Sequence, residues 1–220
     1  MDYLIDIALA GVSALFAWRL SRKARFNGHV SVWLWASAFA ALGSGAMLGM
    51  FHRQIGTLLG GTPADMLLRL SLAVQLLANT LLLAGVIIGY CAGKARWAGL
   101  SLAGAKLLVL LMYLGVKPSF DIVVYDAAFT GLPLLALCTY GAWTWKYPYA
   151  QWIVAGAVIW VLAAMLHQGR VGASQFVTAD DLFRAFEFGV LFLFVRGGWN
   201  MRDEPTSTTR LKLKAMSWRL

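Results

Sequence analysis

The sequence consists largely of apolar segments of about 18 to 25 residues, the length that an α-helix needs to cross the hydrocarbon core of a bilayer. The chain is 60% hydrophobic and only 13% charged, whereas about a quarter of the residues of a soluble domain are charged. This composition excludes a soluble enzyme, a disordered chain and a disulfide-rich secreted domain. We therefore expect an all-α, polytopic membrane protein.

Seven apolar segments are separated by charged or helix-breaking residues. The breaks are a basic run at Ser21–Arg25, backbone breakers at Gly60–Pro63 and Lys117–Pro118, and a loop of small residues at Gly169–Ser174. The predicted spans are Tyr3–Leu20, Val30–Phe51, Ala64–Tyr90, Trp97–Val116, Ile122–Trp143, Tyr149–Leu166 and Asp181–Gly198. They predict one seven-helix transmembrane domain, residues 1–201, followed by a basic tail, residues 202–220.

The basic residues predict the orientation of the chain. Most of the 19 Lys and Arg residues follow or precede spans on one side. Most of the tryptophans, Trp35 among them, lie near the same side, where we expect them to form an interfacial aromatic belt. The positive-inside rule places this side in the cytoplasm. We therefore expect the N-terminus outside and the C-terminus inside, in a plasma or bacterial inner membrane.

The position of the positive charge beside apolar spans also argues against nucleic acid as a partner. Membrane lipids are the expected partners. The tail segment Arg210–Leu220 alternates basic and apolar residues, which suits contact with anionic headgroups. A disordered tail that lies in solvent, away from the membrane, is an alternative that the sequence supports equally.

Ionisable side chains within the spans gather in the predicted outer half of the membrane. Each costs about 3 kcal/mol or more in hydrocarbon and therefore needs a partner or a function. Asp65 and Arg69 share one helix face, and Asp180, Arg184 and Glu187 share another, at spacings of three and four residues. We expect these faces to enclose a polar pocket that is open to the outer leaflet. The candidate substrate-binding residues are Arg69, Lys106, Asp126, Arg184 and Glu187.

Structural ion pairs are the alternative for the same side chains. In this interpretation the three cations pair with carboxylates inside the bundle, and no ligand is bound. The expected pairs are Arg69 with Asp65, Lys106 with Asp126, and Arg184 with Glu187.

Two histidines end predicted spans on the outer side, His52 on the second span and His167 on the sixth. Two histidines and a carboxylate can hold zinc with one position open for water, and zinc-bound water attacks amides and esters. With Asp180, or alternatively Asp65 or Asp181, as the third ligand, the sequence predicts a zinc site. Motifs of soluble enzymes, such as GxSxG, HExxH and a P-loop, are absent.

The segment Gly45–His52, followed by Asp65 at the start of the next span, resembles the alkaline ceramidase/adiponectin-receptor superfamily of seven-span hydrolases. In that pattern Ser-xxx-His ends span two, Asp opens span three, and His-xxx-His lies in span seven. The resemblance implies that His52 and Asp65 are catalytic and that His52 binds zinc. The metal motif is degenerate, because Leu48 replaces the serine, and Asp180 and Arg184 replace the two histidines. An ion pair between the latter two could replace the metal.

The leading hypothesis is a membrane protein that binds, and in the enzymatic case hydrolyses, an amide- or ester-linked lipid. The alternative is a non-enzymatic transporter, sensor or structural subunit with another membrane protein as partner. In that case Lys106, Asp126 and Glu187 would form a coupling network. The sequence has no inverted repeat and no helix pair broken at midspan, which disfavours a typical secondary transporter.

Overall fold

The computed structural model describes residues 2–145, 150–170 and 178–203 of the 220-residue chain. Every regular element in these ranges is an α-helix. The helices are α1 (Asp2–Asn27), α2 (Val30–Leu59), α3 (Gly61–Tyr90), α4 (Gly93–Val116), α5 (Asp121–Trp145), α6 (Ala150–Gln168) and α7 (Ala179–Trp199).

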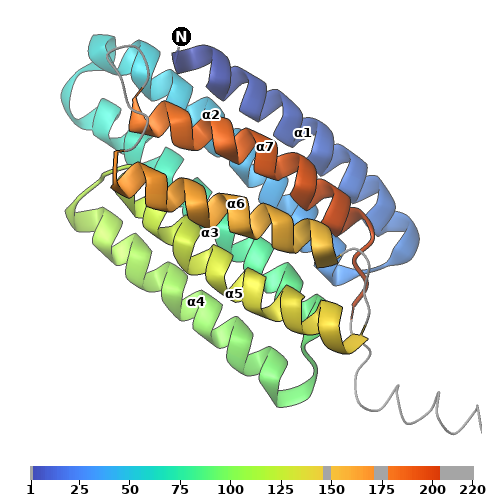
Figure 1. Ribbon diagram of the computed structural model, residues 1–220. Helices are drawn as coiled ribbons and strands as arrows, with labels where there is room; N and C mark the ends of the chain where they lie inside the picture. Colours follow the sequence, from blue (N-terminus) through green and yellow to red (C-terminus); the bar gives the residue numbers. More distant parts are fainter. Residues whose placement is uncertain (1, 146–149, 171–177, 204–220) are drawn as a thin grey trace, which may run out of the picture.

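The helices form an antiparallel bundle in which successive helices run in opposite directions (Figure 1). Helix α1 packs between α2 and α7, α6 packs between α5 and α7, and α3 contacts α2, α4 and α5. Helix α4 lies at the edge, where Leu102, Val109 and Met112 are exposed. Such an apolar outer surface suits contact with lipid rather than with water.

Six of the helices are long and apolar enough to cross a membrane. The exception among the described helices is α7, which carries Asp180, Asp181, Arg184, Glu187 and Arg196. The expectation of an all-α fold is therefore confirmed for the described residues, and six of its helices suit a membrane protein by length and composition.

The charged residues divide between the two ends of the bundle. Helices α1, α3, α5 and α7 begin at the end that we call the acidic end, which holds Asp6, Asp65, Asp121, Asp126, Asp180, Asp181 and Glu187. The opposite, basic end holds Arg19, Arg22, Lys23, Arg25, Lys94, Arg96 and Arg196. The two sets of charges that the sequence assigns to opposite sides thus lie at opposite ends of the fold.

Helices α1 and α2 extend furthest beyond their predicted spans. Helix α1 continues through the basic run Ser21–Arg25 and ends at Asn27, before Gly28 with its φ of +66°. Lys and Arg are good helix formers and are favourable near a helix C-terminus, so the break predicted at this run is wrong. Helix α2 likewise continues beyond Phe51, and Gly60 with a φ of +59° follows its last residue.

Trp35 joins three helices at the centre of the core. Its ring packs against Phe39 of α2 and Phe194 of α7, and its Nε1 donates to the carbonyl of Leu82 on α3 at 3.0 Å. This tryptophan is fully buried and therefore does not belong to the interfacial aromatic belt, unlike the exposed residues Trp18, Trp33, Trp97 and Trp199.

Two glycines make room for this ring. A Cβ at Gly85 on α3 would lie 2.3 Å from Cδ1 of Trp35, and a Cβ at Gly198 on α7 would lie 2.4 Å from its Cε3. The close packing of α2, α3 and α7 thus depends on the absence of side chains at these two positions.

We predict that Gly85→Ala lowers the free energy of unfolding by about 1–3 kcal/mol, because the new methyl group overlaps the Trp35 ring. Thermal unfolding in detergent measures this loss. The matched control is Gly104→Ala on α4, where a Cβ meets nothing within 4 Å and where alanine favours the helix. Equal effects of the two substitutions would contradict the packing around Trp35.

Candidate functional site

A buried carboxylate links three helices at the acidic end. Asp6 of α1 is fully buried and forms an ion pair with Arg184 of α7. Its Oδ2 also lies 2.6 Å from Nη2 of Arg53, on α2. Two cations thus compensate one carboxylate, which is the arrangement that a buried charge requires.

The Arg184 guanidinium is enclosed on its other sides. It lies over the ring of Phe120 at 4.8 Å from the centroid, a cation–π contact. Glu187, three residues further along α7, is also buried and interacts electrostatically with Arg184. We call Asp6, Arg53, Arg184 and Glu187 the buried charge cluster.

Small residues let α3 approach α2 next to this cluster. The Ser71 hydroxyl donates to the carbonyl of Gly45 at 2.8 Å, and the Gln75 amide donates to the same hydroxyl at 3.2 Å. A Cβ at Gly45 would lie 2.8 Å from Cγ of Gln75, and one at Gly49 would lie 3.1 Å from Oγ of Ser71. Gly45 and Gly49 therefore allow the two helices to approach closely.

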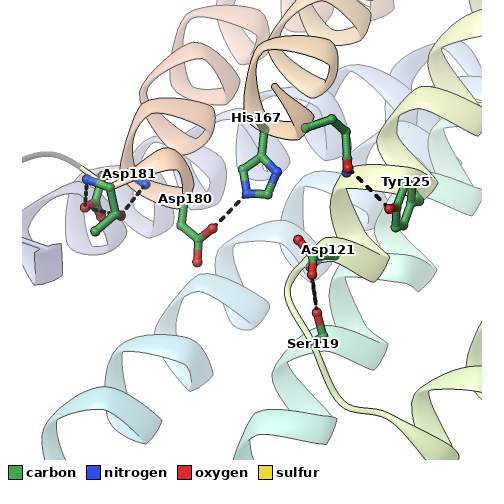
Figure 2. A network of polar contacts seen from close by, with 8 residues as sticks. Ser119, Asp121, Tyr125, His167, Asp180 and Asp181 are labelled. Atoms are coloured by element: carbon green, nitrogen blue, oxygen red, sulfur yellow. Dashed lines mark hydrogen bonds and ion pairs between the residues drawn. The ribbon is translucent and has the colours of Figure 1, made fainter. Parts of the chain in front are cut away.

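A second polar group lies where α6 ends and α7 begins. Nε2 of His167 contacts Oδ1 of Asp180 at 2.8 Å, and Figure 2 shows the two side chains pointing toward one another. They line a cavity of about 440 Å³ together with Asp121, Tyr125, Gln168, Arg170 and Ala179. We call this cavity the outer pocket. It carries charges of both signs.

The imidazole of His167 is held between rings. The centroids of Phe120 and Phe183 each lie 6.0 Å from its centroid. Its Nδ1 is enclosed and has no hydrogen-bond partner among the described residues. Only the Nε2 edge of the ring therefore takes part in the polar contacts of the outer pocket.

Local sequence fixes the start of α7 and with it the position of Asp180. The Thr178 hydroxyl accepts a hydrogen bond from the backbone N–H of Asp181 at 3.2 Å. The Asp181 carboxylate accepts one from the backbone N–H of Thr178 at 3.2 Å. This capping box begins the helix. Across the pocket, Asp121 accepts a hydrogen bond from Ser119 at 2.8 Å, and Tyr125 donates to Gln168 at 3.2 Å (Figure 2).

His52 and Asp65, the residues of the superfamily resemblance, lie at the junction of α2 and α3. Nδ1 of His52 lies 3.0 Å from the carbonyl oxygen of Ala64. The adjacent Asp65 is exposed. Arg69, one turn later, donates to the carbonyls of Leu114 and Gly115 at 2.8 and 2.6 Å. Arg69 therefore satisfies the last carbonyls of α4 and forms these contacts in place of the expected pair with Asp65.

Lys106 reaches a carboxylate between α4 and α5. Its Nζ lies 2.5 Å from Oδ1 of Asp126 and 2.7 Å from Oγ1 of Thr130. Asp126 and Thr130 are fully buried, and the buried amide of Asn79 on α3 faces the same carboxylate. The predicted ion pair of Lys106 with Asp126 is therefore confirmed. It joins α3, α4 and α5, in contrast to the buried charge cluster, which joins α1, α2 and α7.

The predicted site residues thus fall into separate groups at one end of the bundle. Arg184 forms its ion pair with Asp6 rather than with Glu187 or Asp180, the partners that the sequence suggests, and Asp180 contacts His167. The described residues do not bring His52, His167 and Asp180 together as three metal ligands. The zinc site remains a prediction of the sequence, and we derive no metal-dependent step from it.

Sequence patterns alone assign no partner to Asp6 or Arg53, and they do not identify Asp121 and Tyr125 as pocket residues. The signal for Asp6 is its position as a lone carboxylate in an apolar segment near the outer start of the first span. Such a group needs a cation at its own depth. Arg53, near the end of α2, and Arg184, near the start of α7, are cations at the same end of the bundle as Asp6.

A family of unknown function (DUF6962) matches residues 1–203, and the chain belongs to this family. The match includes all seven described helices. Comparison with curated proteins and with solved structures gives no significant match.

We predict that Arg184→Met lowers the free energy of unfolding by about 3–5 kcal/mol, because it leaves Asp6 and Glu187 buried with less compensating charge. Thermal unfolding in detergent measures the change. The control is Lys117→Met, which removes an exposed cation that directly follows the last residue of α4, also at the acidic end. It should have little effect on the stability. A small effect of Arg184→Met would show that the pair does not stabilise the bundle.

For the second ion pair, we expect Lys106→Met to destabilise the protein by about 3 kcal/mol, because Asp126 then lacks its cation. Adding Asp126→Leu should recover much of this loss, since no unpaired charge remains buried. The comparison uses thermal unfolding of the two variants in the same detergent. A double variant that is less stable than Lys106→Met alone would contradict this account.

Proposed function

We propose that this member of the family is a seven-span membrane protein that binds the polar headgroup of an ester- or amide-linked lipid in the outer pocket. Its N-terminus lies outside and its C-terminus in the cytoplasm. The basic end supports this orientation, because Lys and Arg are enriched in cytoplasmic segments. The plasma or bacterial inner membrane is the corresponding location.

The position of α7 supports a seventh span. It packs against α1, α2 and α6, and its charged residues Arg184 and Glu187 are buried within the bundle. Charged residues are tolerated in a spanning helix when they face the protein interior and have partners there. The pairing of Arg184 with Asp6 meets this condition.

The mixed charge of the outer pocket carries the proposal of a headgroup ligand. Asp121 and Asp180 offer carboxylates to a cationic group, while Arg170 offers a guanidinium to an anionic one. The pocket lies at the ends of helices, the level at which lipid headgroups meet a spanning bundle. A zwitterionic headgroup, with an ammonium and a phosphate, matches both signs.

The state of His167 favours binding over hydrolysis at this pocket. A histidine that activates water needs one ring nitrogen free to accept the proton. Here Nε2 already contacts Asp180, and Nδ1 is enclosed between rings. We therefore assign His167 and Asp180 a recognition role. Hydrolysis by His52 and Asp65 rests on the superfamily resemblance alone.

The test uses the full chain in detergent, titrated with dioleoylphosphatidylethanolamine or with dioleoylglycerol, which has the same acyl chains and no zwitterionic headgroup. We expect the phospholipid to raise the midpoint of thermal unfolding more than the diacylglycerol does, because ligands of the native state stabilise it. Asp121→Asn/Asp180→Asn should abolish this difference, because both carboxylates of the pocket lose their charge.

Asp65→Asn is the matched control, since it also removes an exposed carboxylate at the acidic end but outside the outer pocket. It should retain the preference for the phospholipid. Loss of the preference in Asp65→Asn alone would instead favour a site at the junction of α2 and α3. Equal stabilisation of the wild type by both lipids would overturn the proposal.

A further inference from the structure

A second cavity lies at the basic end, away from the outer pocket. It has a volume of about 800 Å³ and is formed where α1 ends beside the last turns of α7. Figure 1 shows these two segments side by side. We call this cavity the basic groove.

Four cations line the basic groove, Arg19, Arg22 and Lys23 from α1 and Arg196 from α7. Its described lining includes no carboxylate. Like charges gathered in one cavity repel each other unless an anion lies between them. This differs from the acidic end, where the buried arginine Arg184 has its own carboxylate partner.

Aromatic rings hold these cations in place. Arg22 lies over the ring of Trp18 at 5.1 Å, Lys23 over Trp199 at 4.8 Å, and Arg196 over Trp152 at 4.4 Å. Tryptophan is enriched at the level of lipid headgroups, and cation–π contacts reduce the freedom of the long basic side chains. The groove therefore presents ordered positive charge at a membrane interface.

Apolar surface continues from the groove toward the middle of the bundle. Leu15 of α1 and Phe192 of α7 are 43% and 48% exposed. Phe16, which lines the groove, contacts Phe192 edge to face at a centroid distance of 5.1 Å. An acyl chain of a lipid can lie along this surface while the headgroup of the same lipid contacts the cations of the groove.

We propose that the basic groove binds an anionic glycerophospholipid of the cytoplasmic leaflet. Its phosphate contacts Arg22 and Lys23 of α1 and Arg196 of α7, and its acyl chains lie toward Leu15 and Phe192. The proposal shares the orientation given above but not the outer pocket or its ligand. The chain's own segment 204–220 is a poor occupant, because Arg210, Lys212, Lys214 and Arg219 outweigh Glu204.

The experiment measures binding of dioleoylphosphatidylglycerol and dioleoylphosphatidylcholine to the full chain in detergent, by native mass spectrometry. The anionic lipid should bind more tightly to the wild type. Arg22→Gln/Arg196→Gln should weaken its binding about thirtyfold, given the usual contribution of each basic residue to contact with anionic lipids. Arg22→Lys/Arg196→Lys should retain most of the binding, because it keeps both charges.

The matched control is Arg25→Gln/Lys94→Gln, which removes two exposed cations at the same end but outside the groove. It should leave the affinity for phosphatidylglycerol within about threefold of the wild type, because charges away from the groove act only through the screened field. Equal weakening by the two double variants would overturn the proposal, and so would equal affinity of the wild type for the two lipids. Displacement of bound phosphatidylglycerol by millimolar inorganic phosphate would instead indicate a site for small anions.

Discussion

The architecture depends on one requirement, that the carboxylate of Asp6 has cationic partners inside an apolar bundle. An isolated charge in this environment is very unfavourable, and Asp6 is fully buried. Its partners are Arg184 on α7, at the other end of the described chain, and Arg53 on the neighbouring helix α2. This interaction therefore holds the first and last helices of the fold side by side and brings α2 to them.

The same interaction determines where the outer pocket forms. With Arg184 fixed on Asp6, the first turn of α7 lies beside the end of α6, where Asp180 meets His167. Phe120 contacts both Arg184 and His167 and so links the buried charge cluster to the pocket. The polar side chains thus have two roles. Those of the cluster and of the Lys106–Asp126 pair hold helices together, while those at the helix ends line the outer pocket, where we propose that a lipid headgroup binds.

Sequence reasoning predicts the seven helical segments, the gathering of most Lys and Arg residues at one end, and the pairing of Lys106 with Asp126. These follow from local hydrophobicity, from charge position and from depth along a helix. It does not predict that Arg184 pairs with Asp6, because periodicity gives the face of a helix and not the neighbour of that face. It misplaces Trp35 for the same reason, since the glycines that accommodate its ring lie on α3 and α7. Tertiary packing decides these contacts.

The most direct test of the central claim is a double-mutant cycle on the pair of Asp6 and Arg184, read by thermal unfolding of the full chain in detergent. The variants are Asp6→Asn, Arg184→Met and the two combined. If the side chains interact as the structure shows, the combined variant loses less stability than the sum of the single losses, by about 1–3 kcal/mol. Strictly additive losses would mean that the two residues do not interact, and the account of the fold would be wrong.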